Sequence, residues 1–143
     1  MKFTCMAFTP DGKQLLVATS IGSIIIVDPE TSNQFKQPNI NDLSVIDTSS
    51  DTTKVVKIEQ IIVSDDGKFF ACSDNQCCIS LFKHSKVYDD EEQKVEEWWF
   101  IGKIKTHVRG ITSICFGYSY DENNQIKHRL FSIGKDRRLF EYD

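Results

Sequence analysis

The fold is decided by the stretch Ser132-Ile-Gly-Lys-Asp136-Arg-Arg-Leu-Phe-Glu-Tyr142-Asp143. Asp136 lies in a short polar segment between two apolar ones, and short polar residues tolerate the backbone angles of a tight turn between antiparallel strands. From such a turn its carboxylate can accept a hydrogen bond from His107, which precedes the stretch. Buried polar groups are tolerated when all of them are paired. The spacing therefore predicts a structural, hydrogen-bonded tetrad of His107, Ser132, Asp136 and Tyr142.

This spacing resembles that of a WD-repeat blade, the four-stranded sheet from which β-propellers are built, with Tyr142 in the place usually taken by Trp. Parts of the pattern recur upstream. Pro10-Asp-Gly-Lys13 returns as Asp65-Asp-Gly-Lys68, and Val27-Asp28 returns as Phe82-Lys83 at the same interval. Each unit has an alternating strand, an Asp-Gly turn or its substitute, a second strand, a polar turn and a third strand. The sequence therefore predicts an all-β WD-repeat β-propeller with about three blades.

The repeats also divide the chain. Residues 1–40 are expected to form the first WD-type blade, 41–56 a polar loop, 57–106 the second blade with an acidic insertion at 84–97, and 107–143 the third blade. The third blade is incomplete, because no outer strand follows its third strand. A closed propeller needs roughly 4–8 blades. We therefore expect a partial propeller, which is either a fragment of a longer protein or is completed by another subunit.

The tetrad pattern is degenerate in the first two units. Counting back from Val27, the Asp position holds Ile21 and the Ser position holds Val17. The same count in the second unit gives Gln76 and Cys72. These two blades are therefore expected to depend on apolar packing.

Composition and charge exclude several classes of ligand. Hydrophobic residues make up 40% of the chain, which is enough for a folded core, and the formal net charge is −4 with 17 basic and 21 acidic residues. This balance opposes binding to nucleic acid, to acidic membrane surfaces and directly to tubulin. No apolar run approaches the ~20 residues of a membrane-spanning helix. We expect no nucleic acid and no membrane among the direct partners.

The sequence carries no motif for a cofactor or a metal. The five cysteines are an odd number and include no Cys-x-x-Cys pair, which favours reduced thiols in the cytosol. The neighbours Cys77 and Cys78 point to opposite faces if they lie on a strand, so they cannot easily share one metal ion. We therefore expect core thiols, with no cofactor and no metal.

Three of the tetrad residues are also the residue types of a catalytic triad. The repeat spacing explains His107, Ser132 and Asp136 without catalysis, and similar constellations arise on unrelated folds. A propeller enzyme with Asp and His in its channel is the alternative, but no repeated carboxylate lines the expected inner strands. We predict that the protein is not an enzyme.

The acidic insertion can be interpreted in two ways. It carries Asp89, Asp90, Glu91 and Glu92 and is followed directly by Trp98 and Trp99. A solvated hairpin loop leading into the outer strand is the simpler interpretation. The alternative is a partner contact formed by these six residues, because aromatic residues beside a charged loop lie where propellers are approached from the side.

Several segments are similar to the family of cilia- and flagella-associated protein 251. They are residues 69–74 (Phe-Phe-Ala-Cys-Ser-Asp), 97–107 (Glu-Trp-Trp-Phe-Ile-Gly-Lys-Ile-Lys-Thr-His), 114–118 (Ile-Cys-Phe-Gly-Tyr) and 130–143. The resemblance implies a WD-repeat subunit of the calmodulin- and spoke-associated complex, at the base of radial spoke three in motile cilia. It implies a non-catalytic scaffold of the axoneme, with cilia- and flagella-associated proteins 61 and 91 among its partners. A generic cytosolic WD-repeat adaptor, such as a substrate receptor or a trafficking subunit, remains the alternative.

Overall fold

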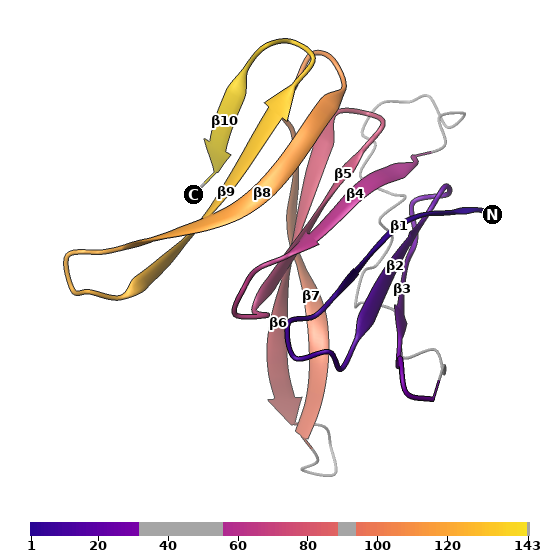
Figure 1. The fold of residues 1–143 in the computed structure, drawn as a ribbon, viewed down its shortest axis with the longest axis vertical. Coiled ribbons are helices and arrows are strands. Elements are labelled where there is room, and N and C mark those ends of the chain that lie inside the picture. Colours follow the sequence, from indigo (N-terminus) through magenta and orange to yellow (C-terminus); the bar gives the residue numbers. More distant parts are fainter. Residues whose placement is uncertain (32–55, 89–93, 143) are drawn as a thin grey trace.

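The chain folds into three antiparallel β-sheets that stand side by side (Figure 1). The computed structural model describes residues 1–31, 56–88 and 94–142, and these contain ten strands and no helix. The first sheet has the order β1 (Phe3–Phe8), β2 (Leu15–Thr19), β3 (Ile24–Val27); the second β4 (Ile58–Val63), β5 (Phe69–Asp74), β6 (Cys78–Tyr88), β7 (Lys94–Lys105); the third β10 (Leu139–Tyr142), β9 (Ile126–Gly134), β8 (Ile111–Tyr120).

The three sheets repeat one backbone design. The first strand of each sheet carries a register shift at the same place, between Phe3 and Cys5, between Ile58 and Gln60, and between Ile111 and Ser113. Such bulges bend a strand and increase its twist. The turn between the second and third strands also repeats, because one residue in each has a positive φ: Gly22 at 81°, Cys77 at 63° and Arg137 at 62°. The repeat inferred from the sequence is therefore a repeat of the backbone.

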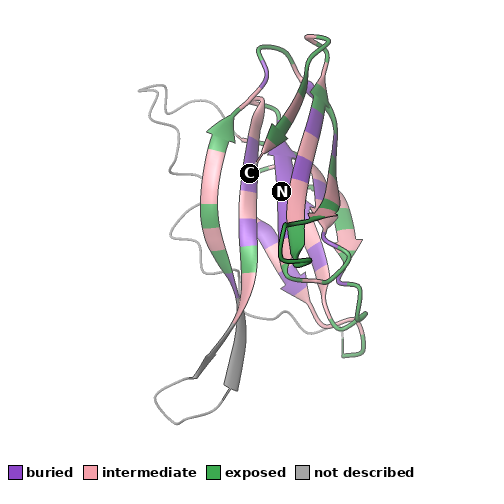
Figure 2. Cartoon of the chain, turned by 90° about the vertical axis from the view of Figure 1, so that its left-hand side faces the viewer, coloured by how far each residue is buried: buried purple, intermediate pink, exposed green. Residues whose placement is uncertain are grey.

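Two apolar clusters of buried residues join the sheets. Buried residues are purple along the strands in Figure 2. The larger cluster lies between the first and second sheets and includes Leu16, Ile24, Phe70, Phe82 and Trp98. The smaller cluster lies between the second and third sheets. The first strand of a sheet makes the closest approach to its neighbour: β4 contacts β1 and β2, and β8 contacts β4 and β5. Apolar burial between successive sheets therefore holds the array together.

The long hairpins correct the expected boundaries. The insertion at 84–97 is not wholly a loop, because β6 continues to Tyr88 and β7 begins at Lys94, with Tyr88 opposite Lys94. Once a register is set, antiparallel pairing can continue into polar residues. The acidic residues 89–92, residues 32–40 of the expected first blade and residues 41–55 of the expected polar loop lie outside the described residues.

Candidate functional site

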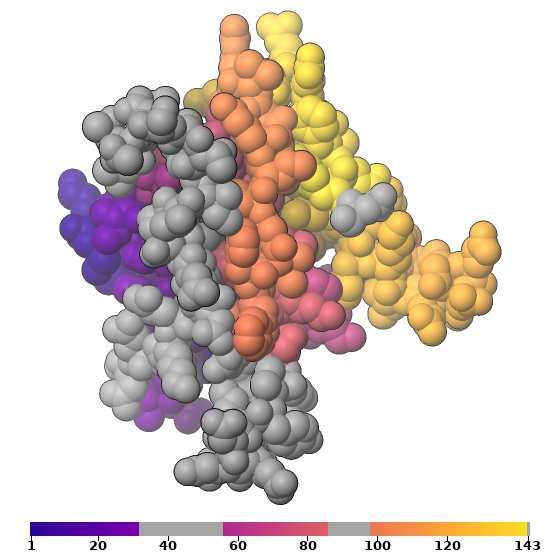
Figure 3. Space-filling view, turned by 180° about the vertical axis from the view of Figure 1, so that it is seen from behind, coloured from indigo at the N-terminus to yellow at the C-terminus, as the bar shows by residue number. Residues whose placement is uncertain are grey.

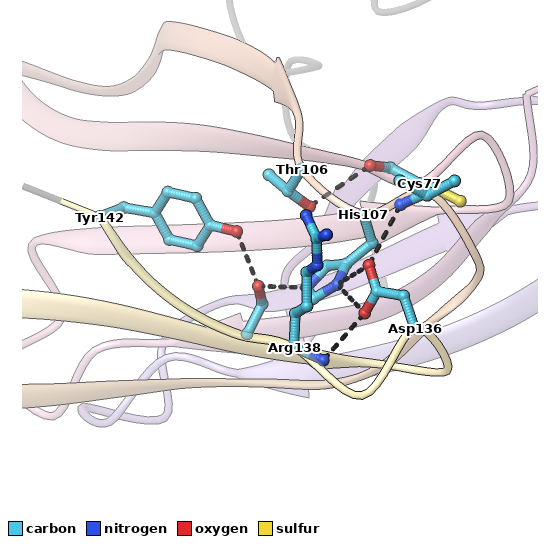
Figure 4. A network of polar contacts seen from close by, with 8 residues as sticks. Cys77, Thr106, His107, Asp136, Arg138 and Tyr142 are labelled. Atoms are coloured by element: carbon cyan, nitrogen blue, oxygen red, sulfur yellow. Dashed lines mark hydrogen bonds and ion pairs between the residues drawn. The ribbon is translucent and has the colours of Figure 1, made fainter.

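The structure brings the four tetrad residues into one hydrogen-bonded chain (Figure 4). His107 precedes β8, Ser132 lies in β9, Asp136 lies in the turn between β9 and β10, and Tyr142 ends β10. His107 Nδ1 is 2.8 Å from one Asp136 oxygen and 3.0 Å from the other. His107 Nε2 is 2.8 Å from the Ser132 hydroxyl, which is 2.7 Å from the Tyr142 hydroxyl. The segment before the third sheet is thus tied to its two last strands.

One arrangement of protons is consistent with every side-chain hydrogen bond of the tetrad. A carboxylate only accepts, so the Nδ1–H of His107 donates to Asp136. With the imidazole neutral, Nε2 then accepts from the Ser132 hydroxyl, and the Ser132 oxygen accepts from the hydroxyl of Tyr142. His107 and Ser132 are each only 1% exposed. Complete pairing is what makes polar groups tolerable at this depth.

Asp136 also organises the backbone around it. Its oxygens accept from the backbone N–H of Val108 at 3.2 Å and of Arg138 at 3.1 Å. Burial raises the pKa of the Asp136 carboxyl, but the hydrogen bonds from His107, Arg138 and Val108 lower it by more, so the pKa lies below its usual value. The carboxylate is therefore held in its ionised, accepting form.

Gly134 is required by the close approach of His107. A Cβ atom at this position would lie 2.3 Å from His107 Nδ1 and 2.8 Å from an Asp136 oxygen. Real side chains cannot approach so closely, so any larger residue would displace the imidazole. The imidazole also packs against Phe140, whose ring meets it edge-on at a centroid distance of 4.9 Å. The imidazole is thus fixed both by hydrogen bonds and by packing.

The tetrad has the connectivity of a catalytic triad but not its accessibility. A nucleophilic serine must reach the reacting atom of a substrate. The Ser132 hydroxyl is instead enclosed, and it is bonded to His107 on one side and to Tyr142 on the other. This arrangement fixes strands and leaves no approach to the hydroxyl.

The first two sheets carry polar substitutes for the tetrad in addition to the apolar packing on which they were expected to depend. The strand registers place Thr19 and Asp74 where the third sheet has Gly134. The Asp74 carboxylate accepts from the backbone N–H of Gln76 and Cys78 and forms an ion pair with Lys103 Nζ at 3.1 Å. Both side chains of this pair are more than nine-tenths buried.

Thr19 performs the corresponding task in the first sheet with a neutral group. Its hydroxyl oxygen accepts from the Ser23 backbone N–H at 3.1 Å and lies 2.8 Å from the Ser23 hydroxyl. In all three sheets, therefore, a short polar side chain closes the turn between the second and third strands. The polar residues Thr19 and Asp74 are visible in the sequence. They lie two positions before the position at which the tetrad pattern has its Asp.

The two neighbouring tryptophans have opposite environments, which corrects half of the expected partner contact. Trp98 is 1% exposed and packs edge-on against Phe70 at a centroid distance of 4.8 Å. Successive residues of a strand face opposite sides, so Trp99 points outward and is 39% exposed. Trp98 belongs to the core and is not available to a partner, whereas Trp99 is. Asp89, Asp90, Glu91 and Glu92 lie outside the described residues.

Two glutamines form polar bridges between sheets that the sequence did not indicate. Gln14 accepts a hydrogen bond of 2.8 Å from the indole N–H of Trp98. Gln60 donates its amide N–H to the Thr112 carbonyl at 2.7 Å and accepts from the Ile114 N–H at 3.2 Å. The amide of Gln60 thereby imitates a backbone peptide and joins β4 to β8. Each bridge sets the position of one sheet against the next.

The thiols and charged groups do not form a metal site in the described part of the chain. No group of three or more His, Cys, Asp or Glu residues there could hold a metal ion. Cys77 lies in a turn and not on a strand. Burial raises the pKa of Cys72 to about 12, so this thiol stays protonated. Within the same residues, no helix has the length and apolar character needed to cross a membrane.

Comparison with solved structures identifies the class of protein. The crystal structure of the RRP9 WD40 repeats matches 99% of this chain and 35% of its own chain, with a TM-score of 0.64 and 17% identity. The β-propeller domain of Myceliophteria thermophila Cps50 (Swd1) matches 99% of this chain and 37% of its own, with a TM-score of 0.60 and 12% identity. At such low identity the likeness establishes the fold, which is that of WD40 β-propeller blades.

Sequence comparison then gives the relatives. No family model matches the chain. The chain is similar over 97% of its length to Cilia- and flagella-associated protein 251 of Tetrahymena thermophila, with 35% identity, of Mus musculus, with 26%, and of Chlamydomonas reinhardtii, with 24%. The resemblance stated from the sequence is confirmed. The chain spans 13%, 9% and 14% of the lengths of these relatives.

Proposed function

We propose that the chain is part of a non-catalytic interaction scaffold at the base of a radial spoke in the axoneme of motile cilia. The observation that carries the proposal is the similarity over 96–97% of the chain to relatives from a ciliate, a green alga and mammals that share one name. That name associates the relatives with cilia and flagella. The finer assignment to the calmodulin- and spoke-associated complex rests on the family resemblance.

The geometry of the sheets supports a scaffold. Propeller blades offer rigid surfaces built from strand edges and turns. The polar groups that resemble catalytic ones are used here inside the fold, to fix His107 and the turn around Asp136. A rigid array with an internal polar network suits the simultaneous binding of several proteins.

The partners that this proposal names are other proteins of the spoke base, among them cilia- and flagella-associated proteins 61 and 91. The negative formal charge, −4, disfavours direct attachment to the acidic surface of the microtubule. We therefore expect the protein to reach the axoneme through its neighbours. Trp99 and the acidic residues 89–92 remain proposed contact residues.

Fractionation of cilia tests the proposal against the adaptor alternative. The full-length protein is tagged at its chromosomal locus, and isolated cilia are extracted with detergent and then with increasing salt. The expected result is that the tag stays with the axoneme after detergent and that its cross-linked neighbours are spoke-base proteins. A tag found mainly in the cell body or in the detergent-soluble fraction would instead favour the cytosolic adaptor.

A further inference from the structure

The β8–β9 hairpin extends beyond the point at which the other two sheets turn. In those sheets, Thr9 and Ser64 directly follow the first strand, and each is hydrogen-bonded to the Asp two residues later, at 2.6 Å and 2.8 Å. The strand registers place Gly117 at the equivalent position of the third sheet. There the pairing continues to Tyr120 and Ile126, and the hairpin tip projects from the body of the chain (Figures 1 and 3).

One face of this extension is aromatic and is turned toward the second sheet. Tyr118 pairs with His128, and Tyr120 pairs with Ile126, so these four side chains share one face. His128 fixes which way that face is turned: its Nε2 is 2.7 Å from an Asp66 oxygen, and its ring meets Phe69 edge-on at 5.1 Å. By the same alternation, the basic residues Lys127 and Arg129 lie on the opposite face.

A pocket of about 260 Å³ lies in the corner between this face and the Asp-Gly turn of the second sheet. Its wall includes Asp65, Asp66, Tyr118, Tyr120 and His128. The rings of Tyr118 and Tyr120 stand 85° apart with their centroids separated by 6.0 Å, and the two residues are 57% and 60% exposed. We call this the aromatic–acidic pocket. Its volume suits a single side chain and is below that of a drug-sized site.

We propose that the aromatic–acidic pocket binds the cationic side chain of an arginine or lysine in an extended segment of a partner protein. A cation is attracted to the face of a tyrosine ring, and two tyrosines, Tyr118 and Tyr120, belong to the wall of this pocket. Asp66 is already shared by His128 and Lys68. The exposed carboxylate of Asp65 is therefore the group that pairs with an incoming cation.

The charges of the pocket also select against other occupants. An acidic segment or a nucleic acid backbone would meet two carboxylates at the turn, which is unfavourable. A purely apolar side chain would cover Asp65 without pairing with it, and this would cost desolvation energy. Lys127 and Arg129 cannot compensate, since they lie on the far face of the hairpin.

The inference goes beyond the proposed function, because it names a binding surface and a ligand chemistry that hold wherever the protein is located. The test uses the whole chain, labelled for nuclear magnetic resonance, and the peptide acetyl-Gly-Arg-Gly-amide as the probe. The same peptide with citrulline in place of arginine keeps the shape and removes the charge. We expect the arginine peptide to shift the ring signals of Tyr118 and Tyr120, and the citrulline peptide to shift them far less.

Matched variants test whether the arginine peptide binds in the aromatic–acidic pocket. We expect Tyr120→Leu and Asp65→Asn each to lower the affinity for the arginine peptide by about two- to fivefold. Ser119→Ala lies on the opposite face of the hairpin and is expected to bind as the parent does. If Tyr120→Leu disturbs the hairpin, as its amide spectrum would show, Asp65→Asn alone decides the test.

Three results would overturn the inference: no shift at either tyrosine, an equal response to the citrulline peptide, or binding that neither pocket variant weakens. None of these results bears on whether the protein stays with the axoneme. Conversely, loss of the protein from the axoneme in the fractionation experiment would leave the peptide titration unchanged. The two proposals therefore fail separately.

Discussion

The indole N–H of Trp98 donates a hydrogen bond of 2.8 Å to the side-chain oxygen of Gln14, across 84 positions of the sequence. The bond joins the outer strand of the second sheet to the residue that precedes β2 in the first sheet. Trp98 is buried and lies in the larger apolar cluster. One side chain thus contributes both apolar packing and a directional bond to the interface between two blades.

The adjacent tryptophans offer a matched test of this role. Trp98→Phe leaves Gln14 without its donor and creates a cavity, so we expect the free energy of unfolding to fall by about 2–4 kcal/mol. Trp99→Phe changes an exposed residue and is expected to cost less than about 0.5 kcal/mol. Urea unfolding followed by circular dichroism measures both. Equal losses in the two variants would contradict the assignment of Trp98 to the core.

The hydroxyl groups of the tetrad should contribute to stability. Ser132→Ala removes the group that bonds both His107 and Tyr142 and leaves the buried Nε2 of His107 and the half-buried hydroxyl of Tyr142 without this partner, so we expect the free energy of unfolding to fall by about 1–3 kcal/mol. Tyr142→Phe removes only the last bond and should cost about 0.5–1.5 kcal/mol. The exposed Ser113→Ala on β8 is the control and should be nearly neutral. If a urea titration shows that Ser132→Ala does not lower the free energy of unfolding, the tetrad does not have a structural role.

Two glycines differ in the space around them. Gly134→Ala places a methyl group against His107, because a Cβ atom at this position would lie only 2.3 Å from His107 Nδ1. We expect this overpacking to lower the free energy of unfolding by about 1–3 kcal/mol. Gly102→Ala meets no atom within 4 Å and should change stability little. Thermal unfolding compares the two. The prediction fails if the alanine at 134 is tolerated as well as the alanine at 102.

Acid should weaken the third blade through Asp136. The pKa of this carboxyl lies below its ordinary value of 3.8 in the folded chain, so its contribution is present above pH 3.8 and is lost as the pH falls through the lower, folded pKa. The variant Asp136→Asn cannot be protonated there and should lose less stability over the same acid range. Unfolding free energies measured from neutral pH to about pH 3 compare the two proteins. Parallel pH profiles would show that Asp136 does not contribute.

The repeat and the tetrad could be predicted from the sequence because both depend on local spacing. Asp136 lies four positions after Ser132 because the turn between two paired strands fixes that distance, and the observed pairing of Ile133 with Leu139 follows from it. His107 is farther away, but the blade pattern places a histidine at the approach to the first strand. The fold class could therefore be predicted mainly from the residues of the local turns.

Features that depend on contacts between sheets could not be predicted in this way. Whether Trp98 or Trp99 faces the core depends on the register of β7 against β6, which includes a shift between Leu81 and Phe82. The pairing of Asp74 with Lys103 depends on that register too. The bridge from Gln60 to β8 requires two blades to be placed beside each other. Alternation in one strand contains none of this information.

The most direct test of the spoke-base proposal is electron cryotomography of axonemes from cells that lack the protein. The proposal predicts that density disappears from the base of the third radial spoke and returns when the wild-type gene is restored. It also predicts that a tag on the restored protein falls within the recovered density. An unchanged spoke base in the deletion cells, with the tag located elsewhere, would contradict the proposal.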